Sequence, residues 1–234
     1  MRISHDAYTD TGRRSNNEDA YLAAPALGLY AVADGMGGYE GGEVASRIAL
    51  ESLLAYFERL GKDALDLESD EAREQAAMAI RIAHRAVQRA AVGELRDMGT
   101  TIAMMLVRGS RALLAHVGDS RVYRLREGEL ALLTRDHSLV AEMEAAGLSP
   151  SASLSHVVTQ ALGQGASVKP DVRAVDVLPG DRFLLCTDGL TDVLGPREIG
   201  DELSRRRGPA RALVDAAYRV GSTDNITALV VRAR

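Results

Sequence analysis

The sequence predicts an α+β fold in which largely antiparallel sheet is covered by helices. Apolar residues recur at alternate positions in some segments and at every third or fourth position in others, and strands come in runs while helices come in pairs. The first helical pair precedes the run of strands, so it cannot supply the crossovers of a parallel sheet. The chain of 234 residues has neither an internal repeat nor a low-complexity linker. We therefore expect one domain over residues 1–234.

Strands are expected where short apolar or alternating runs stop at glycine, proline or aspartate. Two of these runs are joined by Glu127-Gly128, which is typical of a hairpin turn. Another two flank the turn Pro179-Gly180-Asp181, and the last run is strongly apolar. The expected strands cover residues 3–9, 28–33, 100–107, 112–117, 121–126, 129–133, 172–177, 182–186 and 226–231.

Helices are expected where apolar residues follow a period of three to four. Two long segments show this pattern before the run of strands, and a shorter one lies in its middle. Two more begin with Pro196 and Pro209, and proline is favoured as the first residue of a helix. The expected helices cover residues 43–60, 71–92, 138–146, 196–205 and 209–220.

Composition excludes several classes of partner. The chain is 46% hydrophobic and 26% charged, which is ordinary for a folded protein and argues against disorder. Its formal net charge is −5 and it has no long basic block, so we expect no nucleic-acid partner. The first residues lack the apolar run of a signal peptide, and no stretch of eighteen uninterrupted apolar residues occurs. We expect a cytoplasmic protein with no membrane partner.

A single cysteine, Cys186, excludes an internal disulfide and a thiolate metal cluster. It lies within an apolar run directly before Thr187-Asp188, so we interpret it as a small buried hydrophobic residue.

Four apolar runs are each interrupted or terminated by an aspartate in a turn of small residues, and these are Asp34, Asp119, Asp188 and Asp224. One such aspartate is an ordinary turn residue, but four of them predict that carboxylates converge. Converging carboxylates raise one another's pKa unless cations compensate them. Hard divalent cations prefer oxygen ligands, which favours Mg²⁺ or Mn²⁺. Zinc is disfavoured, because cysteine is scarce and no His-x-x-x-His pair occurs.

A second acidic cluster, Asn16-Asn17-Glu18-Asp19, follows Arg13-Arg14. The planar fork of an arginine beside a metal cluster can bind a phosphate through two hydrogen bonds. The alternative interpretation is an exposed charged turn without a role in chemistry.

The order of these motifs resembles a known family. The motifs that carry the resemblance are Arg14-Ser15-Asn16-Asn17-Glu18-Asp19, Asp34-Gly35-Met36-Gly37-Gly38, Gly99-Thr100-Thr101, Gly118-Asp119-Ser120-Arg121, Asp136-His137-Ser138, Ala161-Leu162-Gly163, Asp188-Gly189-Leu190-Thr191-Asp192 and Asp224-Asn225-Ile226-Thr227. Together they resemble the metal-dependent Ser/Thr protein phosphatases of the type 2C class, and the short chain resembles the bacterial members. The resemblance implies a four-layer α-β-β-α sandwich of two mainly antiparallel sheets flanked by helix pairs.

The resemblance also implies the residues of a two-metal site. Asp34 would bridge both catalytic ions, and the carbonyl of Gly35 would bind the second. Asp188 and Asp224 would complete the first site. Glu18 would lie beside the second ion, directly or through water.

Further roles follow from the same motifs. Asp119 and Asp192, with Asp188, resemble a third metal site of bacterial relatives. Asp19 would hold nearby waters, and Asn225 would orient Asp224 or a water. In relatives, a flap beside the cleft occupies the place of residues 139–155, whose small polar residues predict mobility.

Substrate recognition and proton transfer depart partly from the family pattern. Arg14 would bind the substrate phosphate. Met36 stands where eukaryotic members have the histidine proposed as general acid, and Tyr39 stands where relatives often have another histidine. We therefore assign no general acid, although His137 and His156 are possible substitutes; a structural role is the alternative for both.

The expected function is hydrolysis of phosphoserine and phosphothreonine on proteins by a metal-activated water, which opposes a Ser/Thr kinase. The protein is expected to be a monomer. Two alternatives remain at this point: a catalytically weak phosphoprotein-binding module of the same fold, and a metal phosphohydrolase that acts on a small molecule such as a nucleotide.

Overall fold

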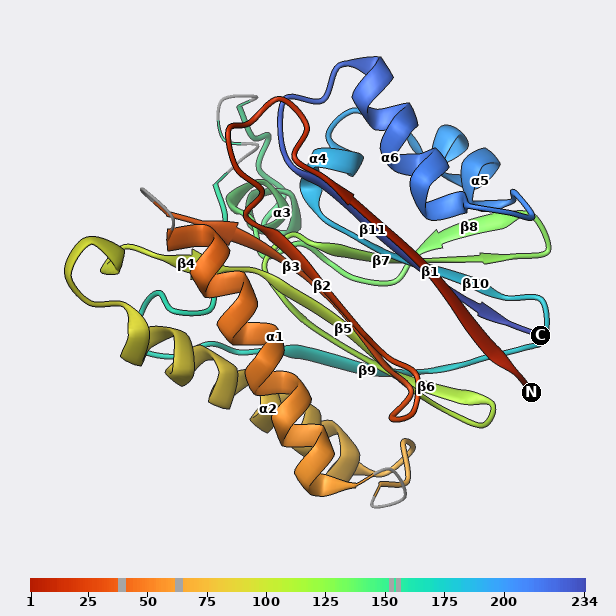
Figure 1. The fold of residues 1–234 in the computed structure, drawn as a ribbon, viewed down its shortest axis with the longest axis horizontal. Helices are drawn as coiled ribbons and strands as arrows, with labels where there is room; N and C mark the ends of the chain where they lie inside the picture. Colours follow the sequence, from red (N-terminus) through yellow and green to blue (C-terminus); the bar gives the residue numbers. More distant parts are fainter. Residues whose placement is uncertain (38–40, 62–64, 152–153, 155–156) are drawn as a thin grey trace.

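Two antiparallel sheets pack face to face in the computed structural model, which describes residues 1–37, 41–61, 65–151, 154 and 157–234 (Figure 1). The strands of the first sheet are, in spatial order, β1 (Ile3–Asp10), β11 (Ile226–Ala233), β10 (Arg182–Cys186), β7 (Arg121–Arg126) and β8 (Glu129–Leu132). Those of the second sheet are β2 (Asp19–Ala24), β3 (Leu29–Met36), β5 (Ile102–Arg108), β6 (Arg111–Val117) and β9 (Asp171–Asp176), with β4 (Gly99–Thr100) paired to β3.

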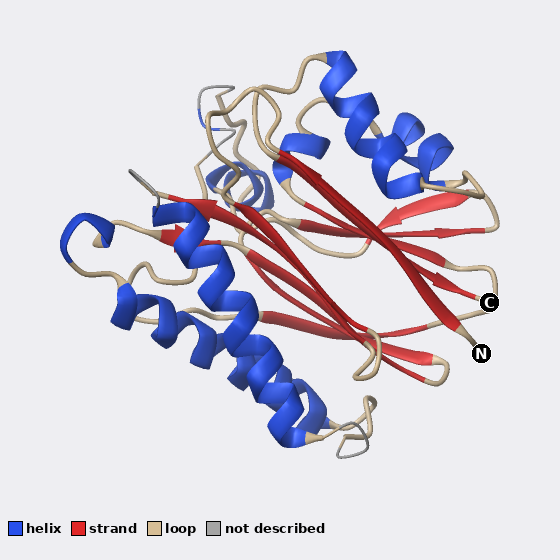
Figure 2. Ribbon diagram, in the orientation of Figure 1, coloured by secondary structure: helices blue, strands red, loops and turns tan. Residues whose placement is uncertain are grey.

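Helices cover the outer face of each sheet, as Figure 2 shows. The second sheet is covered by α1 (Gly41–Leu60) and α2 (Asp70–Ala90), and the first by α5 (Pro196–Leu203) and α6 (Pro209–Val220). Shorter helical elements are η1 (Gly93–Leu95), α3 (Leu139–Ala145) and α4 (Asp188–Thr191). The predicted four-layer α-β-β-α sandwich is therefore confirmed. None of the described helices is both long and apolar enough to cross a bilayer.

The period-two pattern of the central strands divides the core into layers. In β3, Leu29, Ala31 and Ala33 pack in the cluster beneath α1 and α2. Tyr30 and Val32, which alternate with them, pack between the two sheets. Because both faces of β3 are buried, its sequence appears as a continuous apolar run. Burial of each large apolar side chain here stabilises the fold by about 1.5–3 kcal/mol.

The ends of two helices follow local sequence signals. The hydroxyl of Ser69 caps α2 by accepting a hydrogen bond from the backbone N–H of Ala72 at 3.1 Å. Ser138 caps α3 in the same way, through the N–H of Ala141 at 3.3 Å. Within the expected flap, α3 buries none of its residues. Little apolar burial offsets its ordering entropy, but mobility of residues 139–155 stays a prediction.

Several elements differ from the sequence expectation. Strand β2 was not expected, because its first residue belongs to the polar run that ends at Asp19. Asp34 lies inside β3, two residues before its end, and Asp188 begins the short helix α4. The expectation that each aspartate interrupts or terminates a strand is wrong for Asp224, which precedes β11. A turn of aspartate and small residues has the same sequence pattern whether it precedes a strand or follows one.

Candidate active site

The predicted aspartates lie at one end of the sandwich. Antiparallel pairing places Cys186, the last residue of β10, opposite Ala228 near the start of β11. In the second sheet Val117, the last residue of β6, pairs with Ile102 at the start of β5. The turn after β6 thus lies beside the end of β3, and the turn after β10 lies beside the turn before β11. The hydrogen bond from Thr187, after β10, to Asp19, which pairs with Asp34 of β3, brings these two edges together. The sequence prediction that these acidic turns converge agrees with this arrangement.

Two carboxylates face each other across the pairing of β2 and β3. Asp19 and Asp34 are direct partners in the antiparallel register. The Asp34 side chain also shares a hydrogen bond with Asp188. Asp19 is 8% exposed, and its Oδ2 accepts a hydrogen bond from the hydroxyl of Thr187 at 2.8 Å. Its Oδ1 is buried without a hydrogen-bond partner, so one oxygen inside the acidic cluster has unused capacity to accept.

Burial and mutual repulsion shift the pKa values of this cluster upward. Burial, followed by the charges of Asp19 and Asp188, raises the pKa of Asp34 well above its ordinary value. Burial and the charge of Asp188 raise the pKa of Asp119 to about 7. Burial also raises the pKa of Asp19 to about 7, although the hydroxyls of Thr227 and Thr187 oppose this shift. A bound cation would relieve this repulsion, so the donor set fits a divalent metal.

Buried hydroxyls hold the backbone around Asp34, and sequence reasoning assigned them no role. The N–H of Asp34 donates to Thr101 Oγ1 at 3.0 Å, and the Asp34 carbonyl accepts from the Thr101 N–H at 2.9 Å. Thr101 Oγ1 and Ser120 Oγ are also hydrogen-bonded, at 2.7 Å. Because Ser120 follows Asp119, this chain of contacts connects two acidic turns. The motif Gly99-Thr100-Thr101 could have pointed to these hydroxyls, but the sequence does not reveal that they lie beside Asp34.

Asn225 connects Asp224 to the loop before β2. Its backbone N–H donates to Asp224 Oδ1 at 2.8 Å. Its side-chain amide donates to the carbonyls of Thr11 and Asn16, at 2.9 and 2.8 Å, and its Oδ1 accepts from the N–H of Glu18 at 2.8 Å. The side chain is thus a bridge between two segments far apart in the sequence.

Arg14, the residue predicted to bind the substrate phosphate, lies at the rim of the acidic cluster. Arg14 Nη2 is 2.7 Å from Asp224 Oδ2, and the Arg14 side chain is 58% exposed. Such an exposed pair contributes little to stability, so the guanidinium can turn toward a substrate at small cost. Nearby, burial raises the pKa of Glu18, while a hydrogen bond from Asn16 and the charge of Arg14 lower it.

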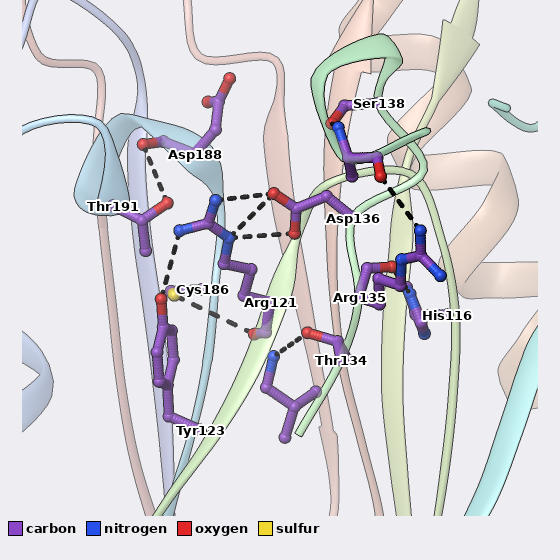
Figure 3. Close-up of polar contacts among 12 residues, drawn as sticks. His116, Arg121, Tyr123, Thr134, Arg135, Asp136, Ser138, Cys186, Asp188 and Thr191 are labelled. Atoms are coloured by element: carbon purple, nitrogen blue, oxygen red, sulfur yellow. Dashed lines mark hydrogen bonds and ion pairs between the residues drawn. The ribbon is translucent and has the colours of Figure 1, made fainter. Parts of the chain in front are cut away.

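A second ion pair lies beside α4. Figure 3 shows the guanidinium of Arg121 facing the carboxylate of Asp136, with Asp188 on the neighbouring segment. Arg121 Nε and Nη2 contact both carboxylate oxygens at 2.6–3.1 Å. The charge of Asp136 adds to the raised pKa of Asp119, as does that of Asp192, which is exposed after α4. Arg121 thus neutralises one acid beside the cluster.

Comparison with known proteins identifies the family. The model of the family described as protein phosphatase 2C matches residues 10–229, nearly the whole chain. The chain belongs to the protein phosphatase 2C family.

Relatives within the phosphatase 2C family cover this chain almost completely. The serine/threonine protein phosphatase PstP of Mycobacterium tuberculosis is 35% identical over 97% of this chain, which spans 44% of the length of PstP. The protein phosphatase PhpP of Streptococcus pneumoniae is 34% identical over 95% of this chain and 94% of its own length. A crystal structure of the PstP catalytic domain with two manganese ions has a TM-score of 0.86 and 34% identity, over 98% of this chain and 97% of that one.

Of the two histidines considered for proton transfer in this phosphatase 2C chain, the structure describes His137. His137 Nδ1 accepts the backbone N–H of Gly118 at 3.3 Å, so Nε2 carries the proton and faces Asp171 at 3.4 Å. With His116 these two side chains form a compact group, whose potential ligand atoms lie within 4.8 Å of one another. Both nitrogens of His137 are therefore engaged, which favours a structural role. Tyr39 and His156 lie outside the described residues.

Cys186 is fully buried, as expected, and burial raises the pKa of its thiol to about 12. Its Sγ is 4.0 Å from the carbonyl oxygen of Arg121. The interpretation of Cys186 as a small core residue is confirmed.

Gly35→Ala is expected to destabilise the fold and abolish activity together. A Cβ at Gly35 would overlap the carbonyl oxygen of Gly42 and lie 2.6 Å from that of Glu18. Both obstacles are backbone atoms, so strand β3 would have to move away from α1. We expect a loss of about 2 kcal/mol in unfolding free energy, or roughly 5 °C in Tm. Thermal denaturation measures this loss.

Gly200→Ala is the matched control for Gly35→Ala. Gly200 lies inside α5, and the nearest obstacle to a Cβ there is Leu130 Cβ at 4.0 Å. Alanine is the better helix former by about 1 kcal/mol, so this variant should be at least as stable as the wild type. Equal stability of both variants would contradict the close approach at Gly35.

Proposed function

We propose that residues 1–234 act as one catalytic domain that hydrolyses phosphoserine and phosphothreonine on proteins. The observation that carries this proposal is the convergence of Asp19, Asp34, Asp119 and Asp188 at one end of the sandwich, with an unpartnered buried oxygen on Asp19. Relatives that align with most of the chain bear the names of protein phosphatases. Nothing among them supports a non-catalytic binding module.

We propose Mn²⁺ or Mg²⁺ as the cofactor. The PstP catalytic domain binds two manganese ions, and the oxygen donors of this chain suit such hard cations. Asp34 would bridge two ions, with Asp188 and Asp224 on the first and the Gly35 carbonyl and Glu18 on the second. When bound, two such ions lower the pKa of a water and neutralise charge on phosphate oxygens.

A third ion would be held by Asp119 and Asp192 together with Asp188. The charges of both Asp188 and Asp192 act on the Asp119 carboxyl, which supports this grouping.

The chain's own groups would position the substrate and the ligands. Arg14 has an exposed guanidinium beside Asp224, where it can bind phosphate oxygens. Thr101 fixes the backbone of Asp34, and Thr187 orients Asp19. A covalent phosphocysteine is disfavoured, since the chain's one cysteine is Cys186, which is buried and has a raised pKa.

The partners that this activity implies are phosphoproteins and a Ser/Thr kinase whose targets the enzyme reverses. We propose that the enzyme works in the cytoplasm as a monomer.

Metal dependence and substrate class are tested in one assay. Metal-stripped protein is given a phosphothreonine peptide, para-nitrophenyl phosphate and a nucleotide panel, each with Mn²⁺, Mg²⁺ or Zn²⁺. We expect turnover of the peptide and of para-nitrophenyl phosphate with Mn²⁺ or Mg²⁺, none in EDTA, and no rescue by Zn²⁺. Turnover in excess chelator would rule out the metal mechanism. A nucleotide preferred over the phosphopeptide would point to the small-molecule alternative.

A further inference from the structure

Four arginines line a cavity at the end of the sandwich opposite the acidic cluster. Arg182, Arg206, Arg232 and Arg234 surround a space of about 400 Å³ together with Gly180, Asp181 and Ala233. Arg182 begins β10, whereas the acidic cluster lies beyond Cys186 at its other end. Roughly 13 Å of extended strand separates these two residues. The chain termini also lie at this far end (Figure 1). This arginine pocket is therefore distinct from the candidate active site.

The acidic groups near the arginine pocket offset little of its positive charge. Asp181 is 1% exposed, and both its oxygens accept from Arg126 at 2.7 Å. Asp6 Oδ2 accepts from the N–H of Ala210 at 3.0 Å and lies 3.9 Å from Arg232 Nη2. Asp181 is thus paired with an arginine outside the pocket, and the long ion pair of Asp6 with Arg232 leaves the other three guanidinium groups uncompensated. The pocket thus concentrates positive charge in a chain whose net charge is −5.

Two of the arginines are held in place by backbone carbonyls. Arg182 Nη1 donates to the carbonyls of Leu203 and Arg205, at 2.6 and 2.7 Å. Arg232 Nη1 donates to the carbonyl of Arg206 at 3.1 Å, while its Nε is buried without a hydrogen-bond partner. These contacts fix the guanidinium groups and leave donor capacity unused.

The other two arginines are open to a ligand. Arg206 and Arg234 are exposed, and neither side chain pairs with a carboxylate in the described part of the chain. Burial and the charges of Arg232 and Arg234 lower the pKa of Arg182, which agrees with mutual repulsion in the pocket. A bound anion would relieve that repulsion.

We propose that the arginine pocket binds a phosphoryl group carried by a protein segment. Planar guanidinium forks match the oxygens of a phosphoryl group and can donate two hydrogen bonds each. A concave space of about 400 Å³ suits one compact group better than a flat membrane surface. The pocket would hold a second phosphorylated site of a substrate while the first lies at the acidic cluster. The inference that the phosphoryl group belongs to a phosphoprotein rests on the proposed function. The inference that the pocket binds a phosphoryl group does not.

Binding is measured by amide NMR on the full metal-stripped chain, so that no metal ion at the acidic cluster competes for the probe. The probes are inorganic phosphate and a peptide with a non-hydrolysable phosphonate analogue of phosphoserine. We expect saturable shifts of the Gly180 and Ala233 amides. The double variant Arg206→Glu/Arg234→Glu should weaken peptide binding at these amides by about tenfold or more, because two attractive charges become repulsive. Higher ionic strength should weaken it too.

Arg89→Glu is the matched control, because Arg89 is an exposed residue of α2 on the other sheet. It should leave binding at Gly180 unchanged. Turnover of para-nitrophenyl phosphate by the metal-loaded double variant should equal that of the wild type, since neither arginine lies near the acidic cluster.

Absence of saturable shifts, or equal affinity in the double variant and the wild type, would overturn the proposal. Binding to vesicles that contain a phosphoinositide, without binding to the phosphonate peptide, would overturn it in favour of a membrane site. Saturable binding by a protein that hydrolyses no phosphopeptide would contradict the proposed function and leave the arginine pocket as a phosphoryl site.

Discussion

Asparagine in place of Asp34 is expected to lower kcat/KM for a phosphopeptide by about 10³-fold, or roughly 4 kcal/mol in the activation barrier. Asp34 lies opposite Asp19 in the strand register and shares a hydrogen bond with Asp188, so it is central among the carboxylates. The substitution keeps the size of the side chain and removes one negative charge. Steady-state kinetics at saturating Mn²⁺ measures the loss.

Stability separates this effect from misfolding. Because Asp34 is repelled by its acidic neighbours, Asp34→Asn should leave metal-free protein at least as stable as the wild type. Asp201→Asn makes the same chemical change at an exposed position of α5 and should alter neither activity nor stability. An Asp34→Asn enzyme within about tenfold of the wild-type rate, roughly 1.4 kcal/mol, would show that Asp34 does not bridge the ions.

Metal-free protein is expected to lose stability as the pH rises from about 5 to about 8. The folded-state pKa of Asp19 is about 7, above its ordinary value of 3.8, so the folded state holds a proton that the unfolded state has released. Unfolding free energy therefore falls with pH through this window. For Asp19 alone the change is about 2.5 kcal/mol, which corresponds to roughly 5–10 °C in Tm.

The measurement is a series of thermal denaturations in EDTA and in Mn²⁺ across this pH window. Mn²⁺ should flatten the slope, since bound cations compensate the ionised carboxylates. Asp119→Asn should make the slope in EDTA shallower, because burial and Asp188 also raise the pKa of Asp119 to about 7. A Tm in EDTA that rises with pH over the same window would contradict the clustering of these acids.

Local patterns predicted most elements of the fold but not their pairing. Alternation and apolar runs identified β3, β5 and β6, because neighbouring residues in a strand face opposite layers. The pairing of β1 with β11 joins Ile3 to Ala233, at the two ends of the sequence, and no local pattern contains that register. Strand β2 was missed because a polar turn and a strand overlap at Asp19.

The same limit applies to the candidate site. Asp34, Asp119 and Asp188 were recognisable because small-residue turns follow apolar runs. Two other features depend on contacts between segments far apart in the sequence. Thr187 donates to Asp19, and Asn225 holds the loop before Glu18. Arg14 was predicted to face phosphate; its ion pair with Asp224 could be found only in three dimensions.

The burial of Cys186 has a practical consequence for spectroscopy. The chain has one cysteine, and its thiol is fully buried with a raised pKa, so maleimide reagents have no reactive native target at neutral pH. A cysteine introduced at exposed Leu148, in the segment beside α3, would therefore carry a fluorophore or spin label selectively. Cys186 need not be replaced before labelling, so the core beneath the acidic cluster stays unaltered in the labelled protein.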